Sequence, residues 1–288
     1  MDREIQSRIL AMQRNEITEY HIYTRLAKML EKTENGPILR TIGEEEKKHH
    51  DFLSKFTGKS ARPKGFKVVF FVLIARILGI TFALKLMERG EEEAQEIYDA
   101  MSRQVPEAKQ IIEDEDAHEE KLLQMLKEER LEYVGSIVLG LNDALVELTG
   151  ALAGLSFALQ NTRLIAVAGL ITGIAASFSM AASEYLSNRT EGNSEGAVKS
   201  AVYTGIAYIL TVGLLILPYL LFSHYMVCLA ATLGIAIFII FFFNYYVAVA
   251  KDLKFWPRFT EMALLSLGVA AISFGIGVLV RSTIGIDI

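Results

Sequence analysis

The chain has 288 residues, of which 52% are hydrophobic and 22% are charged, and its formal net charge at pH 7 is −5. Its single cysteine, Cys228, excludes an internal disulfide and any iron or zinc centre held by four cysteines. The small net charge says little about partners, and we expect no nucleic acid among them.

The charged residues are unevenly distributed along the chain. Residues 1–132 contain 48 Asp, Glu, Lys and Arg residues, whereas residues 133–288 contain 15. This division predicts a soluble domain over 1–132 and a membrane domain over 133–288. We expect an all-α fold, with a four-helix bundle in the first domain and five membrane-spanning helices in the second.

The soluble domain shows apolar periodicity that is interrupted by turn residues. Asn35, Gly36 and Pro37 predict the first turn, and the stretch from Gly58 to Gly65 predicts the second break. The four helices are therefore expected at 2–32, 37–57 and 66–103, and from Pro106 onward.

The third of these helices begins with a stretch, Val68 to Met87, that is almost apolar enough to cross a membrane. Arg76 and Lys85 interrupt it, and a sixth crossing would put half of the bundle on the other side of the membrane. We interpret it as a bundle helix whose excess apolar surface packs on a partner subunit or lies against the membrane.

One motif occurs twice in the soluble domain. Glu46 and His49 form a Glu-x-x-His pair, Glu115 and His118 form another, and each glutamate follows a proline by nine positions. Residues three apart share one helical face, and proline favours a helix start. Two such pairs can therefore converge on one metal site.

A second repeat lies upstream of each pair. Glu16 is followed by Tyr23 and Glu91 by Tyr98, seven residues on in both cases, which keeps glutamate and tyrosine on one face. Each half of the bundle thus supplies one lone glutamate and one Glu-x-x-His, the ligand set of di-iron or di-manganese carboxylate bundles. Ferrous and manganous ions accept imidazole and carboxylate together. The tyrosines either hydrogen-bond to ligands or fill the bundle.

Other acids and histidines lie close to these motifs. Glu88 is one turn before Glu91 and is a candidate extra ligand, and Glu92 remains an alternative for the third helix. His21 and His50 fall off the ligand face and are expected at the surface. The remaining acids of the two motif regions are interpreted as a solvated face: Glu44, Glu45, Glu113, Asp114 and Asp116.

At these motifs the first domain resembles the erythrin and rubrerythrin branch of the ferritin-like superfamily, over nearly all of residues 1–132. The resemblance implies a di-iron site. Peroxide-reducing rubrerythrins also carry a cysteine-ligated iron module, which one cysteine cannot form. They have an added carboxylate where this chain has Ala94 and Gln95. The resemblance therefore supports iron binding more than peroxidase turnover.

The membrane domain contains five apolar stretches, each near the ~20 residues that a helix needs to cross a bilayer. An odd number of crossings puts the termini on opposite sides. The basic residues at the junctions predict a cytoplasmic amino terminus and an external carboxyl terminus. No cleaved signal is expected. The stretches are 134–158, 164–186, 199–222, 225–250 and 260–281.

Acidic residues lie inside the first two stretches. Asp143 and Glu147 fall in the first, and Met180 and Glu184 in the second, all toward the cytoplasmic ends. Acids within a membrane are costly and mark an ion or proton path. A thioether beside carboxylates suits a borderline transition metal better than magnesium or calcium.

The second domain resembles the vacuolar iron transporter family, over about residues 133–288. The strings that carry the resemblance are Gly-Leu-Asn-Asp from Gly140, Ser-Met-Ala-Ala-Ser-Glu-Tyr from Ser179, and the glycine-rich segment from Ser273 to Gly277. The resemblance implies a five-span dimer that moves ferrous or manganous ion out of the cytoplasm against protons.

Single residues of the membrane domain correspond to that family. Asp143 and Met180 match its pore aspartate and methionine, and Glu184 matches the acid at the cytoplasmic end of span two. Plant members carry a glutamate-rich extension between spans two and three, where this chain has about a dozen residues with Glu191 and Glu195. The bundle is expected to take over metal collection, as in the bacterial membrane-bound erythrin exporters that the whole chain resembles.

These observations favour a homodimeric plasma-membrane transporter of Fe²⁺ or Mn²⁺, coupled to H⁺, with a cytoplasmic bundle that binds iron. Whether the bundle oxidises, stores or delivers iron is left open. The alternatives are a membrane-tethered ferroxidase or peroxidase, and a sensing or storage assembly. A membrane anchor needs only one span and no intramembrane acids. The five spans and their acids therefore favour the transporter.

Overall fold

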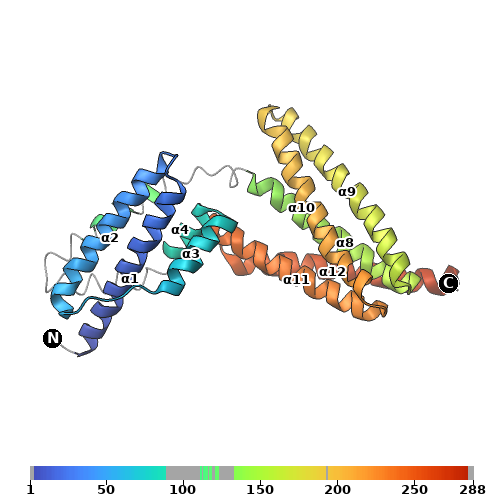
Figure 1. The fold of residues 1–288 in the computed structure, drawn as a ribbon. Helices are drawn as coiled ribbons and strands as arrows, with labels where there is room; N and C mark the ends of the chain where they lie inside the picture. Colours follow the sequence, from blue (N-terminus) through green and yellow to red (C-terminus); the bar gives the residue numbers. More distant parts are fainter. Residues whose placement is uncertain are drawn as a thin grey trace. The chain divides into compact units, whose positions relative to one another are not determined.

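The computed structural model describes residues 3–88, 111, 113–115, 117, 118, 121, 122, 133–192 and 194–284. Each regular element among these residues is a helix (Figure 1), which confirms the predicted all-α fold. The chain divides into two compact units, Met1–Glu128 and Glu129–Ile288, and each is described by itself.

Unit one is built on a helical hairpin whose two members lie side by side (Figure 1). Thr33 Oγ1 donates a hydrogen bond to the Leu30 carbonyl in the turn of this hairpin. Its second helix ends at Gly58, whose left-handed φ of 63° closes the helix through a bond from its N–H to the Ser54 carbonyl. The helices are α1 (Arg3–Met29), α2 (Asn35–Thr57), α3 (Gly65–Leu78) and α4 (Ile80–Glu88), and the described residues between 111 and 122 are also helical.

Apolar side chains from all of these segments form one core. Burial of this core stabilises the unit at about 25 cal/mol per Å² of apolar surface removed from water. The same packing fixes the inward faces of α1 and α2, which also carry the candidate ligands. The fully buried members include Ile22 and Leu26 of α1, Leu39 and Ile42 of α2, and Leu84 of α4.

A single long helix from residue 66 was expected, and the structure instead breaks it at Gly79. This glycine has φ 103° and ψ 155°, a conformation that is open almost only to glycine. α3 therefore ends at Leu78 and α4 starts at Ile80 in a new direction. A 14-residue α3 is also too short to cross a membrane.

Unit two contains five helices that are long and apolar enough to cross a membrane, within the residues described. They match the five predicted stretches to within a few residues, because uninterrupted apolar windows are strong local signals. The helices are α8 (Val134–Leu159), α9 (Thr162–Thr190), α10 (Ser194–Leu221), α11 (Tyr225–Ala250) and α12 (Phe255–Ile284).

Helix α8 lies at the centre of unit two, where it contacts each of the other four helices. Leu145, Leu148 and Leu152 on α8 pack against Tyr208 and Leu215 of α10 in the main core. The outward faces of α9 to α12 carry large exposed apolar side chains, as membrane-facing surfaces do.

Close helix crossings in unit two depend on glycine. A Cβ at Gly150 of α8 would lie 2.8 Å from Val269 Cγ1 of α12, and one at Gly173 of α9 would lie 2.7 Å from Val212 Cγ1 of α10. These separations are shorter than carbon atoms tolerate. Small residues thus let α8 approach α12 and α9 approach α10.

Candidate metal sites

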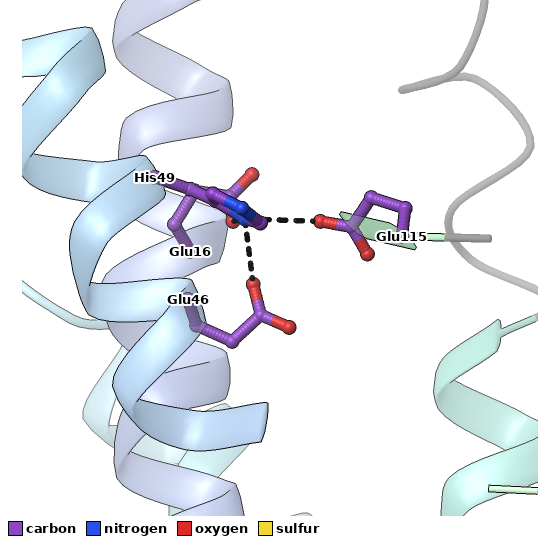
Figure 2. Close-up of side chains that lie close together, drawn as sticks. All are labelled: Glu16, Glu46, His49 and Glu115. Atoms are coloured by element: carbon purple, nitrogen blue, oxygen red, sulfur yellow. Dashed lines mark ion pairs between the residues drawn. The ribbon is translucent and has the colours of Figure 1, made fainter. Parts of the chain in front are cut away.

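Four candidate ligands come together in unit one (Figure 2). α1 supplies Glu16, α2 supplies Glu46 and His49, and Glu115 faces them from the other side of the site. One ligand atom from each lies within 4.8 Å of the others. The three residues on α1 and α2 are buried, so this is a shielded cluster and not a surface run of acids.

His49 is surrounded by carboxylates. Its Nδ1 atom lies 3.6 Å from an oxygen of Glu16, 3.6 Å from one of Glu46 and 3.3 Å from one of Glu115. The two residues on α2 are three positions apart, so one helical face presents both. This arrangement is the one that the doubled Glu-x-x-His motif predicts for its first half.

His118 occupies the corresponding position for the second half. Its Nδ1 atom lies 3.3 Å from an oxygen of Glu46 and 3.7 Å from one of Glu115, and its ring centroid is 5.9 Å from that of His49. Glu46 and Glu115 therefore each face both histidines. Carboxylates in this position can bridge two metal ions.

Each histidine is also held from outside by an acid of the other motif. His49 Nε2 lies 3.2 Å from Asp114 Oδ2, and His118 Nε2 lies 2.6 Å from Glu45 Oε2. We expected Glu45 and Asp114 to be solvated surface acids, and their contacts show otherwise. The available signal was that both stand immediately before a motif glutamate. Such bonds fix the ring orientation and leave Nδ1 facing the cluster.

We predict that Glu45→Gln and Asp114→Asn each weaken metal binding by about 10–100-fold, because loss of an acid that orients a ligand histidine typically has this effect. Mn²⁺ titration of the purified full chain measures the change. Glu44→Gln, an exposed neighbour on the same helix, is the matched control. Equal affinities for all three variants would mean that these contacts do not position the histidines.

The charges of the cluster shift its pKa values. Burial alone would lower the pKa of His118, but the carboxylates of Glu115 and Glu46 raise it to about 10. The pKa of His49 is raised for the same reason by Glu115, Glu16 and Glu46. Burial alone would raise the pKa of Glu46, and His118 and His49 lower it to about 2. Both rings are therefore protonated at neutral pH in the metal-free site.

Metal binding to this cluster should release protons. A histidine binds a metal ion through a neutral imidazole. At any pH below the raised histidine pKa values, the metal ion therefore competes with a proton on each ring. We expect affinity to increase between pH 6 and 8, by about tenfold per pH unit for each proton displaced. Calorimetric titration with Mn²⁺ in two buffers of different ionisation enthalpy counts the protons. A titration that releases none would contradict this protonation state.

Glu19 is a further acid near the cluster that the two sequence motifs do not include. It lies one turn after Glu16 on α1 and is half-buried. Burial, followed by the negative charges of Glu46, Glu16 and Glu115, raises its pKa, while Lys67 acts in the opposite direction. The three-residue spacing from Glu16 was the signal that could have identified it.

Several predicted residues do not join the described cluster. Glu88 ends α4, but its side chain lies outside the described part of the chain, as do Glu91, Glu92 and Tyr98. Tyr23 is buried in the apolar core of unit one. His50 was expected at the surface, but it is buried beside Gln13 and Asp51, with its Nδ1 3.0 Å from Asp51 Oδ1.

The donor set fits a transition metal. Within the described residues, His49 Nδ1, His118 Nδ1 and Glu46 Oε2 are buried and have no hydrogen-bond partner. Buried polar atoms are otherwise almost always hydrogen-bonded, so three that face one centre through ion-pair contacts alone fit a bound cation. Imidazole nitrogen and carboxylate oxygen together suit Fe²⁺, Mn²⁺ or Zn²⁺ better than Mg²⁺ or Ca²⁺.

Unit two holds a second group of polar residues near one end of α8 and α9. Glu184 of α9 accepts hydrogen bonds from Ser136 Oγ of α8, at 2.7 Å, and from Asn188 Nδ2, at 3.0 Å. The bond from Ser136 joins the ends of the two helices, and the bond from Asn188 lies within α9.

Deeper in α8, Tyr208 of α10 donates a hydrogen bond to Glu147 Oε2 at 2.7 Å. Glu147 is nevertheless exposed on the isolated chain. Asp143, one turn earlier, is half-buried and forms no hydrogen bond with a described residue. Met180 of α9 is partly buried against the main core.

Comparison with known protein families assigns part of unit two. Residues 134–198 match the model of the VIT family. The matched segment covers α8, α9 and the start of α10, and so includes Asp143, Glu147, Met180 and Glu184. No curated protein matches the chain. The VIT segment and the five apolar helices indicate an integral membrane protein of a metal-ion transporter type.

Proposed function

We propose that the chain is a homodimeric exporter that carries Fe²⁺, or Mn²⁺, out of the cytoplasm in exchange for protons. The observation that carries this proposal is the VIT-family match over α8 and α9, because the matched helices are those that hold the intramembrane acids. Acids are rare in spans, and three of them, Asp143, Glu147 and Glu184, lie on α8 and α9, which supports a path along these two helices. The sequence resemblance described above supports the same ion and the same direction.

The acids are placed so that they can act in succession. Glu184 lies at the end of α9 where Ser136 and Asn188 hold it, and it can take a metal ion from solvent. Asp143 lies about two turns further along α8 than Ser136, by helical rise. A carboxylate that binds a divalent ion and takes up a proton when the ion leaves couples the two movements.

The exposure of Glu147 supports a dimer. A carboxylate on the outer surface of a membrane helix cannot face lipid without a large cost, and one hydrogen bond from Tyr208 does not cover it. A second copy of the chain, related by a two-fold axis beside α8, would cover it and give the path a second set of Asp143 and Met180.

We further propose that unit one is a ferritin-like di-metal bundle that collects the ion on the cytoplasmic side of the plasma membrane. Its support is the buried cluster of Glu16, Glu46, His49, Glu115 and His118. Positive charges at the inner junctions support this orientation, with the carboxyl terminus outside. When loaded, the site would supply redox-active metal, and the residues of the chain bind and orient it.

Flux measurement tests the proposal. The full chain is reconstituted in liposomes that contain a divalent-metal indicator and a pH indicator, and Fe²⁺ or Mn²⁺ is added to the side that carries unit one. We expect metal entry together with proton movement in the opposite direction. A protein that binds metal in the bundle and passes none across the bilayer would instead favour the membrane-tethered ferroxidase.

A further inference from the structure

Helix α3 is apolar on two opposite faces. At about 100° per residue, Val68, Phe71 and Ala75 point to one side, where they pack into the core of unit one. The other side carries an apolar stripe that the described residues of unit one leave exposed. Its members span roughly a third of the helix circumference and are 42–83% exposed: Phe66, Val69, Phe70 and Leu73. An amphipathic bundle helix needs only one apolar face, so this stripe requires a partner.

Charges around the stripe identify that partner. From Gly58 to Met87 the chain has six basic residues and no acidic one. Lys67 and Arg76 are exposed on α3 and lie on opposite sides of the stripe in helical projection. Lys59 and Arg62 are exposed just before α3. The chain as a whole is acidic, so this cationic segment is a local feature.

We propose that α3 is an interfacial helix that docks unit one on an anionic lipid surface, with the stripe at the acyl boundary and the basic side chains among the headgroups. Aromatic and branched residues on one face with flanking Lys and Arg are the composition of such helices. Long basic side chains can reach the headgroups while their stems cover apolar surface. A second copy of unit one would bring a second set of these cations against the first, whereas anionic lipid neutralises them.

The lipid surface is also always within reach. Unit one ends at Glu128. Helix α8, a candidate membrane span, begins at Val134, so only a few residues of the chain separate unit one from a membrane span. A helix of modest affinity suffices under this constraint, because tethering raises its effective concentration at the membrane. The proposal does not depend on whether unit two carries metal.

A single label tests the proposal on the full chain. Cys228 is the only cysteine and is buried with its Sγ donating to the Pro218 carbonyl, so Cys228→Ser keeps a donor there. Leu73→Cys is then labelled with a nitroxide or an environment-sensitive fluorophore in nanodiscs of mixed neutral and anionic lipid. Lys28→Cys, exposed on α1, is the matched control.

We expect the label at position 73 to be quenched severalfold more strongly by lipid-borne than by aqueous quenchers, and the label at position 28 to show the reverse. The lipid contact at position 73 should weaken in neutral lipid and in raised salt. It should also weaken in the triple variant that combines Lys59→Gln, Arg62→Gln and Arg76→Gln. A label at position 73 that is reached mainly by aqueous quenchers overturns the proposal. Shielding from both quenchers, with disulfide formation between two chains, assigns the stripe to a second copy and also overturns it. Contact of equal strength in neutral and anionic lipid overturns the electrostatic part.

Discussion

Asp143→Asn is expected to abolish metal flux while the bundle still binds metal with unchanged stoichiometry. Asn is nearly isosteric with Asp but cannot ionise, so it can neither offset a divalent ion nor carry the returning proton. An uncompensated charge within the membrane costs at least ~2.5 kcal/mol, which corresponds to a rate loss of about 70-fold for a single ion. The flux of Mn²⁺ and the accompanying pH change in liposomes measure the effect.

Two comparisons make this result specific to the path. Met180→Leu keeps the volume of the side chain and removes the thioether, so it should reduce flux less than Asp143→Asn. Asp252→Asn makes the same change in the turn between α11 and α12, outside the five candidate spans, and should leave flux near the parental rate. If Asp143→Asn carries metal at the parental rate, α8 is not the pathway, and the membrane-tethered ferroxidase or peroxidase becomes the favoured function.

The second large effect is expected in unit one. Glu46 and Glu115 each face both histidines, so the double variant Glu46→Ala, Glu115→Ala should lose both ions of the bundle, whereas the parental chain binds about two there. Mn²⁺ titration of the full chain, with Asp143→Asn in both proteins to suppress binding in the path, measures this stoichiometry.

A matched pair of acids separates lost ligands from lost charge. Glu44 and Glu113 stand in the same acidic runs but are exposed, so Glu44→Ala, Glu113→Ala removes two charges away from the centre. We expect this control to keep two ions. Circular dichroism should show equal helix content for both variants. If the Glu46→Ala, Glu115→Ala variant binds as much metal as the parental chain at equal helix content, these two glutamates are not the ligands of the site.

The parts of the fold that depend on local pattern could be predicted from the sequence. Apolar windows are long and nearly free of charge in the second half, so the five spans were located to within a few residues. The equal spacing within the two motifs indicated that His49 and His118 approach the same acids. Periodicity was informative there because one helical face carries each pair.

Other features depend on contacts that no local pattern records. Glu45 and Asp114 belong to acidic runs that look like any solvated face, and only the approach of the other motif gives each a histidine. His50 is buried because Gln13, 37 residues earlier, packs beside it. The break at Gly79 was missed because a lone glycine is tolerated within many helices, and its φ is set by the packing on both sides.

The crossed contacts of Glu45 and Asp114 make the two motifs interdependent. Neither motif is a self-sufficient half-site, since the acid that orients each histidine is contributed by the other. A substitution of Glu45 therefore acts first on His118, some seventy residues away in sequence. A substitution of Asp114 acts first on His49. Loss of either acid therefore leaves one histidine without the contact that orients its ring, although the histidine's own motif is intact.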